Sequence, residues 1–128
     1  NNESGYSSQT DGSVAPAIRR WDNSDYTILG SGSIASVLGE FAWIRLRING
    51  STINSKYWFD TNSEPSNWQV TVTDSTYSGS GGAGIFQFRG RKCEIDIFGV
   101  GTDGSTAPTS SGGTTIPNAP TGLTLTEL

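Results

Sequence analysis

Two acidic residues, Glu94 and Asp96, come closest to a catalytic pair by type and spacing. We expect residues 93–100 to form a strand, and in a strand the alternation of side chains places both carboxylates on one face. Retaining hydrolysis of a glycosidic bond needs two carboxyl groups about 5–5.5 Å apart, one as nucleophile and one as acid. Glycoside hydrolysis is therefore the first activity to consider from the sequence.

Other catalytic chemistry is restricted because the 128 residues include no histidine. This excludes a Ser-His-Asp triad and any metal held by imidazole. The single cysteine, Cys93, can form no internal disulfide, and its place in an expected strand favours a buried, structural side chain. Asp60, Asp74 and Asp103 lie in or beside expected loops without the dense spacing of a calcium loop. We therefore expect no catalytic residue, no metal site and no cofactor.

The charge balance bears on possible partners. Eight basic and 12 acidic side chains give a net charge of −4, which argues against a nucleic-acid binder. No apolar run approaches the roughly 20 residues that span a bilayer, so we expect no membrane span. The low charge and the abundance of Ser, Thr and Gly indicate an extracellular or virion-surface protein. Sequons at Asn2 and Asn49 permit N-glycosylation there. Because the chain begins without Met, we interpret it as a processed or partial product.

A carbohydrate site would need exposed aromatic faces flanked by polar groups. We consider four aromatic residues as candidate glycan contacts: Trp21, Trp43, Trp58 and Tyr77. Trp43 and Trp58 are out of phase with the aliphatic residues of their expected strands, so they either face solvent or face a second layer. Tyr6 and Tyr26 are also of suitable type, but for most of these rings we favour a packing role.

The elements that must position these residues are short strands, because period-two alternation recurs and no segment shows a helical period. The clearest is a hairpin over residues 41–60. Its first strand alternates Ala42, Ile44, Leu46 and Ile48 with Trp43, Arg45 and Arg47. Asn49-Gly50 is expected to supply the left-handed backbone angles of the turn. The return strand alternates Ile53, Ser55, Tyr57 and Phe59 with Asn54, Lys56, Trp58 and Asp60.

Further strands are expected on either side of this hairpin. Two short strands, 14–21 and 26–29, flank a turn at residues 22–24. A half-buried strand over residues 68–73 should direct Trp68, Val70 and Val72 inward. Two more strands are expected at residues 85–88 and 93–100, joined by a basic turn that we interpret as solvated. The fold class is therefore all-β.

The composition changes after this point. Residues 105–120 hold three of the five prolines among Ser, Thr and Gly, which is typical of an extended linker. Residues 121–128 alternate leucine with threonine, so Leu123, Leu125 and Leu128 could face a core. A lone strand is not stable in water. We therefore expect residues 121–128 to dock on a neighbour or to begin a next domain.

Several motifs together resemble a known family: W-I-R-L-R-I-N-G (43–50), K-Y-W-F-D (56–60), E-P-S-N-W (64–68), T-D-S (73–75) and I-D-I-F-G-V-G-T-D-G (95–104). They resemble the C-terminal half of concanavalin A-like, laminin G-like jelly-roll domains of phage-tail and bacterial surface proteins. This implies an antiparallel jelly-roll β-sandwich over residues 1–104. Members usually have a further N-terminal half of strands. Either that half was not included, or a neighbouring subunit completes the sandwich, since this polypeptide holds too few strands to cover both sheets.

Two further likenesses bear on function. Laminarinase-type β-glucanases share the jelly-roll architecture and carry an E-x-D-x-E strand, but Phe98 stands at the third acidic position here. The resemblance therefore implies a chain that is not an enzyme. Residues 117–128 are similar to the first strand of a fibronectin type III domain, and the two modules occur together in phage tails and fibres.

These features predict a structural or assembly module of an extracellular fibre, filament or phage tail. Its partners would be copies of itself or a neighbouring domain, linked through the strand 121–128. The alternative is a carbohydrate-binding adhesion module of a larger surface protein, with a glycan as its partner.

Overall fold

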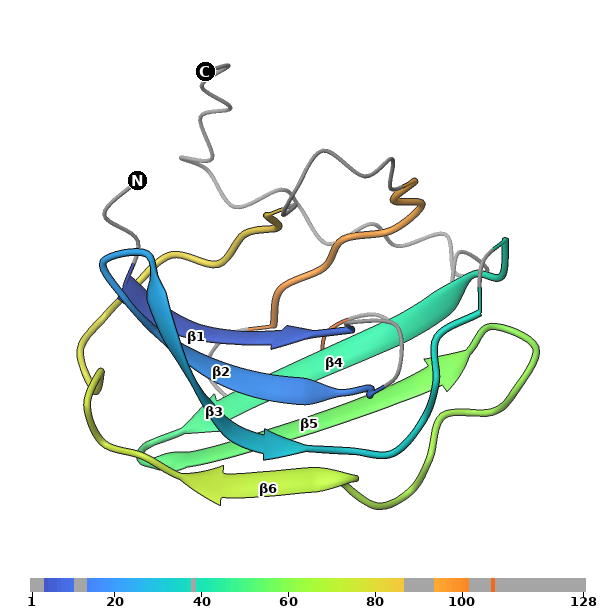
Figure 1. Cartoon of the computed structure of the whole chain (residues 1–128). Helices are drawn as coiled ribbons and strands as arrows, with labels where there is room; N and C mark the ends of the chain where they lie inside the picture. Colours follow the sequence, from blue (N-terminus) through green and yellow to red (C-terminus); the bar gives the residue numbers. More distant parts are fainter. Residues whose placement is uncertain (1–3, 11–13, 38, 87–93, 102–106, 108–128) are drawn as a thin grey trace. The chain divides into compact units, whose positions relative to one another are not determined.

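The structure is a computed structural model that describes residues 4–10, 14–37, 39–86, 94–101 and 107. Across these residues the protein is all-β, with two three-stranded antiparallel sheets and no helix (Figure 1). The strands are β1 (Ser4–Gln9), β2 (Ala17–Asp22), β3 (Asp25–Ser31), β4 (Ala42–Asn49), β5 (Thr52–Phe59) and β6 (Val70–Thr73). Nothing in the described ranges is a helix of the length and apolarity that would cross a membrane.

The chain divides into two units, Asn1–Ser80 and Gly81–Leu128. The first unit holds all six strands. In the second, the described residues are 81–86, 94–101 and 107, and none of them is in a strand.

The first sheet has the order β1-β2-β3. Asn23 and Ser24 connect β2 to β3, and both have positive φ, which is the pattern of a type I′ turn. A register shift follows, because Ile18 pairs with Gly30 whereas Arg19 pairs with Ile28. This leaves one extra residue, Leu29, on β3, as in a β-bulge. Strands were expected on both sides of this turn and are found there, although β2 begins at Ala17 and not at residue 14.

The second sheet has the order β4-β5-β6 and contains the expected hairpin. Asn49 pairs with Thr52, so the loop consists of Gly50 and Ser51. Of these two, Gly50 alone has positive φ, at 57°, which is the pattern of a type II′ turn. The turn therefore lies one residue later than expected, and Asn49 remains in the strand.

The two sheets pack face to face in a sandwich-like arrangement (Figure 1), with β1 against β4, β2 against β5 and β3 against β6. Ile18, Ile53 and Val70 form the buried centre. Leu29 and Leu46 pack against them, together with Tyr6 and Val72. The bulge in β3 thus turns Leu29 toward the core and leaves Ile28 exposed on the outer face.

The central strand β5 is buried on both of its faces, from Ile53 to Trp58. Its inner residues face the first sheet. Its outer residues are covered by the segment 64–69, which folds back over the outer face. The Gln69 side chain extends the sheet here, since its Oε1 accepts from the Tyr57 backbone N–H at 2.8 Å and its Nε2 donates to the Tyr57 carbonyl at 2.9 Å.

Two expectations are wrong in their detail. Strand β6 begins at Val70, and Trp68 lies on the outer face beneath Arg47 and Lys56 instead of pointing inward. The described parts of the segments 85–88 and 93–100 are irregular and not strands. Five large apolar residues remain exposed in these segments: Ile85, Phe86, Ile95, Phe98 and Val100.

Candidate functional site

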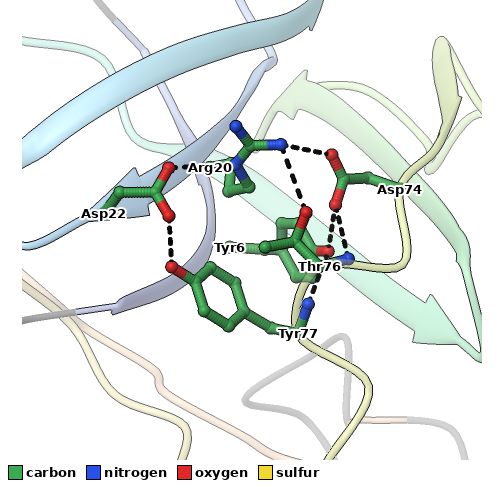
Figure 2. Close-up of polar contacts among 6 residues, drawn as sticks. All are labelled: Tyr6, Arg20, Asp22, Asp74, Thr76 and Tyr77. Carbon is green, nitrogen blue, oxygen red and sulfur yellow. Dashed lines mark hydrogen bonds and ion pairs between the residues drawn. The ribbon is translucent and has the colours of Figure 1, made fainter.

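A polar cluster of six residues joins β1 and β2 of the first sheet to the segment that follows β6 (Figure 2). Its members are Tyr6, Arg20, Asp22, Asp74, Thr76 and Tyr77. The segment is shaped locally by an Asx-turn, because the Thr76 backbone N–H donates to Asp74 Oδ1 at 2.9 Å. This turn brings Asp74, Thr76 and Tyr77 within reach of β1 and β2.

Arg20 stands between the two carboxylates of the cluster. Its Nη1 lies 2.9 Å from Asp74 Oδ2, and its Nε lies 3.0 Å from Asp22 Oδ2. Nη1 also donates to Thr76 Oγ1 at 3.2 Å. One guanidinium thus serves two anions through its fixed fork of donors.

The two tyrosines complete the network on its other side. The Tyr6 hydroxyl donates to Asp74 Oδ1 at 2.6 Å, and the Tyr77 hydroxyl donates to Asp22 Oδ1. The Tyr77 backbone N–H in turn donates to the Tyr6 hydroxyl oxygen at 3.2 Å. The rings meet edge to face, with centroids 5.7 Å apart.

The contacts within the cluster lower the pKa values of its two aspartates and raise those of its two tyrosines. The hydrogen bond from Tyr6, followed by those from Thr76, holds the pKa of Asp74 far below its usual range. The hydrogen bonds from Tyr77 and Arg20 lower the pKa of Asp22. Burial, then the bond to Asp74, raises the pKa of Tyr6, and the bond to Asp22 raises that of Tyr77. Acid–base catalysis is most efficient when a group's pKa lies near the working pH, and these shifts move the pKa values of both carboxylates and both tyrosines away from neutrality.

A second array covers the outer face of the second sheet. Lys56 Nζ lies 2.6 Å from Glu64 Oε1 and donates to the Pro65 carbonyl at 2.8 Å. Arg45 Nη1 lies 3.1 Å from the same Glu64 oxygen. The ring of Trp68 packs against the cationic ends of Arg47 and Lys56, each 4.8 Å from its centroid. These contacts fasten the segment 64–68 over β5.

Trp43 and Trp58, two of the candidate glycan contacts, lie on this same face. Their rings are stacked with centroids 6.1 Å apart and planes 10° apart. Trp43 Nε1 donates to Asp60 Oδ1 at 2.5 Å. Trp58 is only 6% exposed, so its ring is almost fully buried.

Trp21, a third candidate, lies on the outer face of the first sheet. Its ring is 5.2 Å from that of Tyr26, which is 47% exposed, and its Nε1 donates to Ser7 Oγ at 2.8 Å. The Arg19 guanidinium lies 4.2 Å from the centroid of Tyr26. This pair of rings, flanked by Arg19 and Ser7, combines aromatic surface with polar groups. The fourth candidate, Tyr77, has its hydroxyl engaged by Asp22 in the polar cluster.

The β4 edge of the second sheet exposes apolar surface. Ile44 and Ile48 lie on either side of Leu46, so all three share the inner face. Ile44 is nevertheless 41% exposed and Ile48 49% exposed. Beside them, Ser8 of β1 faces Ser55 of β5, with 2.5 Å between the Oγ atoms.

The remaining sequence candidates are not gathered into a site. Glu94 and Asp96 are exposed in irregular chain, so the strand alternation that would align their carboxylates is missing. Among the described residues, no group of three or more acidic, histidine or cysteine side chains is placed to hold a metal. Asn49 ends β4 with an exposed side chain. Several candidates lie outside the described residues: Asn2, Cys93, Asp103, Leu123, Leu125 and Leu128.

The chain has no significant match among protein-family models, curated proteins or solved structures. Its function must therefore be argued from its own residues. Sequence reasoning weighed Asp74 only as a turn carboxylate and did not bring Arg20 and Asp22 together with it. A local signal existed in Asp74-Ser75-Thr76, which is a typical Asx-turn sequence. The pairing with Arg20, 54 positions away, carried no such signal.

Proposed function

We propose that this protein is a non-catalytic structural module of an extracellular fibre, filament or phage tail, in which subunits are linked through the strand 121–128. The six strands would be part of a jelly-roll β-sandwich. The observation that carries the proposal is the partial exposure of Ile44 and Ile48 on the inner face of β4. Apolar residues on the inner face of a sheet are normally covered, so a further element is needed to complete this edge.

The polar cluster supports a structural role. Arg20 forms ion pairs with both of its carboxylates, and each carboxylate also accepts a hydrogen bond from a tyrosine. Its members join the first sheet to the end of β6. A module that transmits mechanical load along a fibre would benefit from such cross-links between its layers.

Sedimentation velocity of the full chain tests this function. We expect species larger than the 13.5 kDa monomer, in proportions that rise with protein concentration. Deletion of residues 117–128 should leave a folded monomer. Unchanged assembly of the deletion variant, or a full chain that stays monomeric at every concentration, would overturn the proposal. Electron micrographs of the native material should show fibres or filaments.

A second candidate function is glycan binding, and the exposed ring of Tyr26 beside the half-buried ring of Trp21 favours it. Aromatic rings beside polar groups are the usual platform for a sugar ring. A glycan array would identify a ligand if this function holds. Tyr26→Ala should then abolish binding, whereas Tyr57→Phe on the inner face should not. An array without any bound glycan would exclude this candidate.

A further inference from the structure

The β4 edge is built to accept one more strand. In the order β4-β5-β6, β4 is the outermost strand, and no described strand pairs with its far side. Its inner face presents Ile44, Leu46 and Ile48 at every second position, and Ile44 and Ile48 are about half exposed. A strand added here would satisfy main-chain donors and acceptors and would place alternate side chains beside these three residues.

We propose that this edge is the acceptor for residues 121–128 of a second copy of the chain. The acceptor β4 has eight residues, and the segment 121–128 matches that length. In a strand, Leu123 and Leu125 share one face, with Thr121 and Glu127 at its two ends, whereas Thr124, Thr126 and Leu128 share the other. Pairing on β4 would place Leu123 and Leu125 beside the exposed isoleucines, and Thr124 and Thr126 beside the arginines of the outer face.

The charges of the two partners are compatible. Strand β4 carries Arg45 and Arg47 and no acidic residue, whereas Glu127 is the only charged side chain in residues 105–128 apart from any terminal charge. Arg45 is paired with Glu64 and Arg47 packs on Trp68, so a donor strand with a single acidic side chain adds no like-charge repulsion at this edge.

The length of the linker favours a second copy over the donor's own domain. Sixteen residues in an extended, proline-rich conformation reach roughly 50 Å, at about 3.1 Å per residue. A domain of about 100 residues has a radius of gyration of only about 13 Å. Pro117 and Pro120 directly precede residues 121–128. A linker of this reach would let the strand contact a second copy, and repeated donation from one copy to the next would give an open, head-to-tail chain.

A pair of complementary variants tests this acceptor site, which rests on the proposed function. The acceptor variant is Ile44→Lys with Ile48→Lys, and the donor variant is Leu123→Lys with Leu125→Lys, both in the full chain. Sedimentation velocity should show each variant alone as a monomer. An equimolar mixture should restore a dimer and nothing larger, because the acceptor variant keeps an intact donor strand and the donor variant keeps an intact edge.

Ile28→Lys is the matched control, because Ile28 is similarly exposed but lies on the outer face of β3; it should assemble as the unmodified chain does. Circular dichroism checks that each variant is folded, and Ile48→Ser replaces the acceptor variant if lysine prevents folding. If the donor variant is monomeric but the acceptor variant still assembles, the proposed function stands and the β4 site is wrong. A monomeric unmodified chain whose melting temperature falls in the donor variant would place the strand on its own domain and overturn the proposal.

Discussion

The Tyr6 hydroxyl donates a hydrogen bond of 2.6 Å to the carboxylate of Asp74, across 68 positions of sequence. Tyr6 belongs to β1 of the first sheet, and Asp74 directly follows β6 of the second. The bond therefore joins the two layers at their polar margin, while Ile18, Ile53 and Val70 join them at the core. Loss of the Tyr6–Asp74 hydrogen bond, or of the contacts in the core, should therefore make the two sheets easier to separate.

We expect Tyr6→Phe to lower the free energy of unfolding by about 1.5 kcal/mol, the usual contribution of a hydrogen bond to a charged acceptor. The ring remains, so its packing against the buried core is kept. Urea denaturation followed by tryptophan fluorescence measures the change. Tyr26→Phe is the control, because Tyr26 is 47% exposed, and it should change stability by less than about 0.5 kcal/mol. Equal effects of the two substitutions would contradict a role for the Tyr6 hydroxyl.

Stability should depend on pH at both ends of the scale and little between them. The pKa of Asp74 and that of Asp22 are lowered by folding, so their contribution is complete above the unfolded pKa, about 3.9, and is lost as the pH falls below it. The pKa of Tyr6 and that of Tyr77 are raised, so their contribution is lost as the pH rises above about 10.

Urea midpoints measured from about pH 3 to neutrality would test the acid limb. Asp74→Asn should be less stable at neutral pH and should lose less on acidification, because the substituted amide takes up no proton. An acid slope identical to that of the unmodified chain would show that Asp74 does not carry the effect.

Much of the first unit could be predicted from its sequence, because local signals and burial agree there. The alternation from Ala42 to Phe59 and the glycine at position 50 specify a hairpin, and the structure contains it. The turn is displaced by one residue, since glycine at the first loop position satisfies the type II′ geometry by itself and asparagine is not required.

The errors occur where long-range contacts override local pattern. Trp68 continues the alternation of Val70 and Val72, but its ring gains more by packing against Arg47 and Lys56 on the outer face. The apolar alternation of residues 95–100 predicts a strand with equal strength, yet no strand forms among its described residues. The residues next to Trp68 in the sequence do not indicate its outward position, and those next to residues 95–100 do not indicate an irregular chain.

Gly30 is expected to tolerate no side chain. A Cβ at this position of β3 would lie 2.8 Å from Val72 Cγ1 and 2.9 Å from Val70 Cγ1, closer than van der Waals contact allows. Both neighbours are β-branched and stiff, so Gly30→Ala should cost about 2 kcal/mol of stability. Gly79→Ala is the matched control, because nothing lies within 4 Å of its added Cβ. Val72→Ala in the Gly30→Ala background should recover part of the loss, and a more stable Gly30→Ala variant would contradict this packing.

The ion pairs of Glu64 should matter more than surface pairs usually do. One carboxylate oxygen serves both Lys56 and Arg45, and the Lys56 side chain is only 9% exposed. Glu64→Gln leaves that ammonium without its anion in a partly dry position, so we expect a loss of about 1 to 2 kcal/mol. Glu40→Gln, at an exposed position, should cost less than about 0.5 kcal/mol. Replacing Lys56 as well, in a variant with Lys56→Met and Glu64→Gln, should recover part of the loss, because the buried ammonium is then removed and only the contact of Arg45 with Glu64 is missing. A double variant less stable than Glu64→Gln would instead show that Lys56 acts mainly through Pro65 and Trp68.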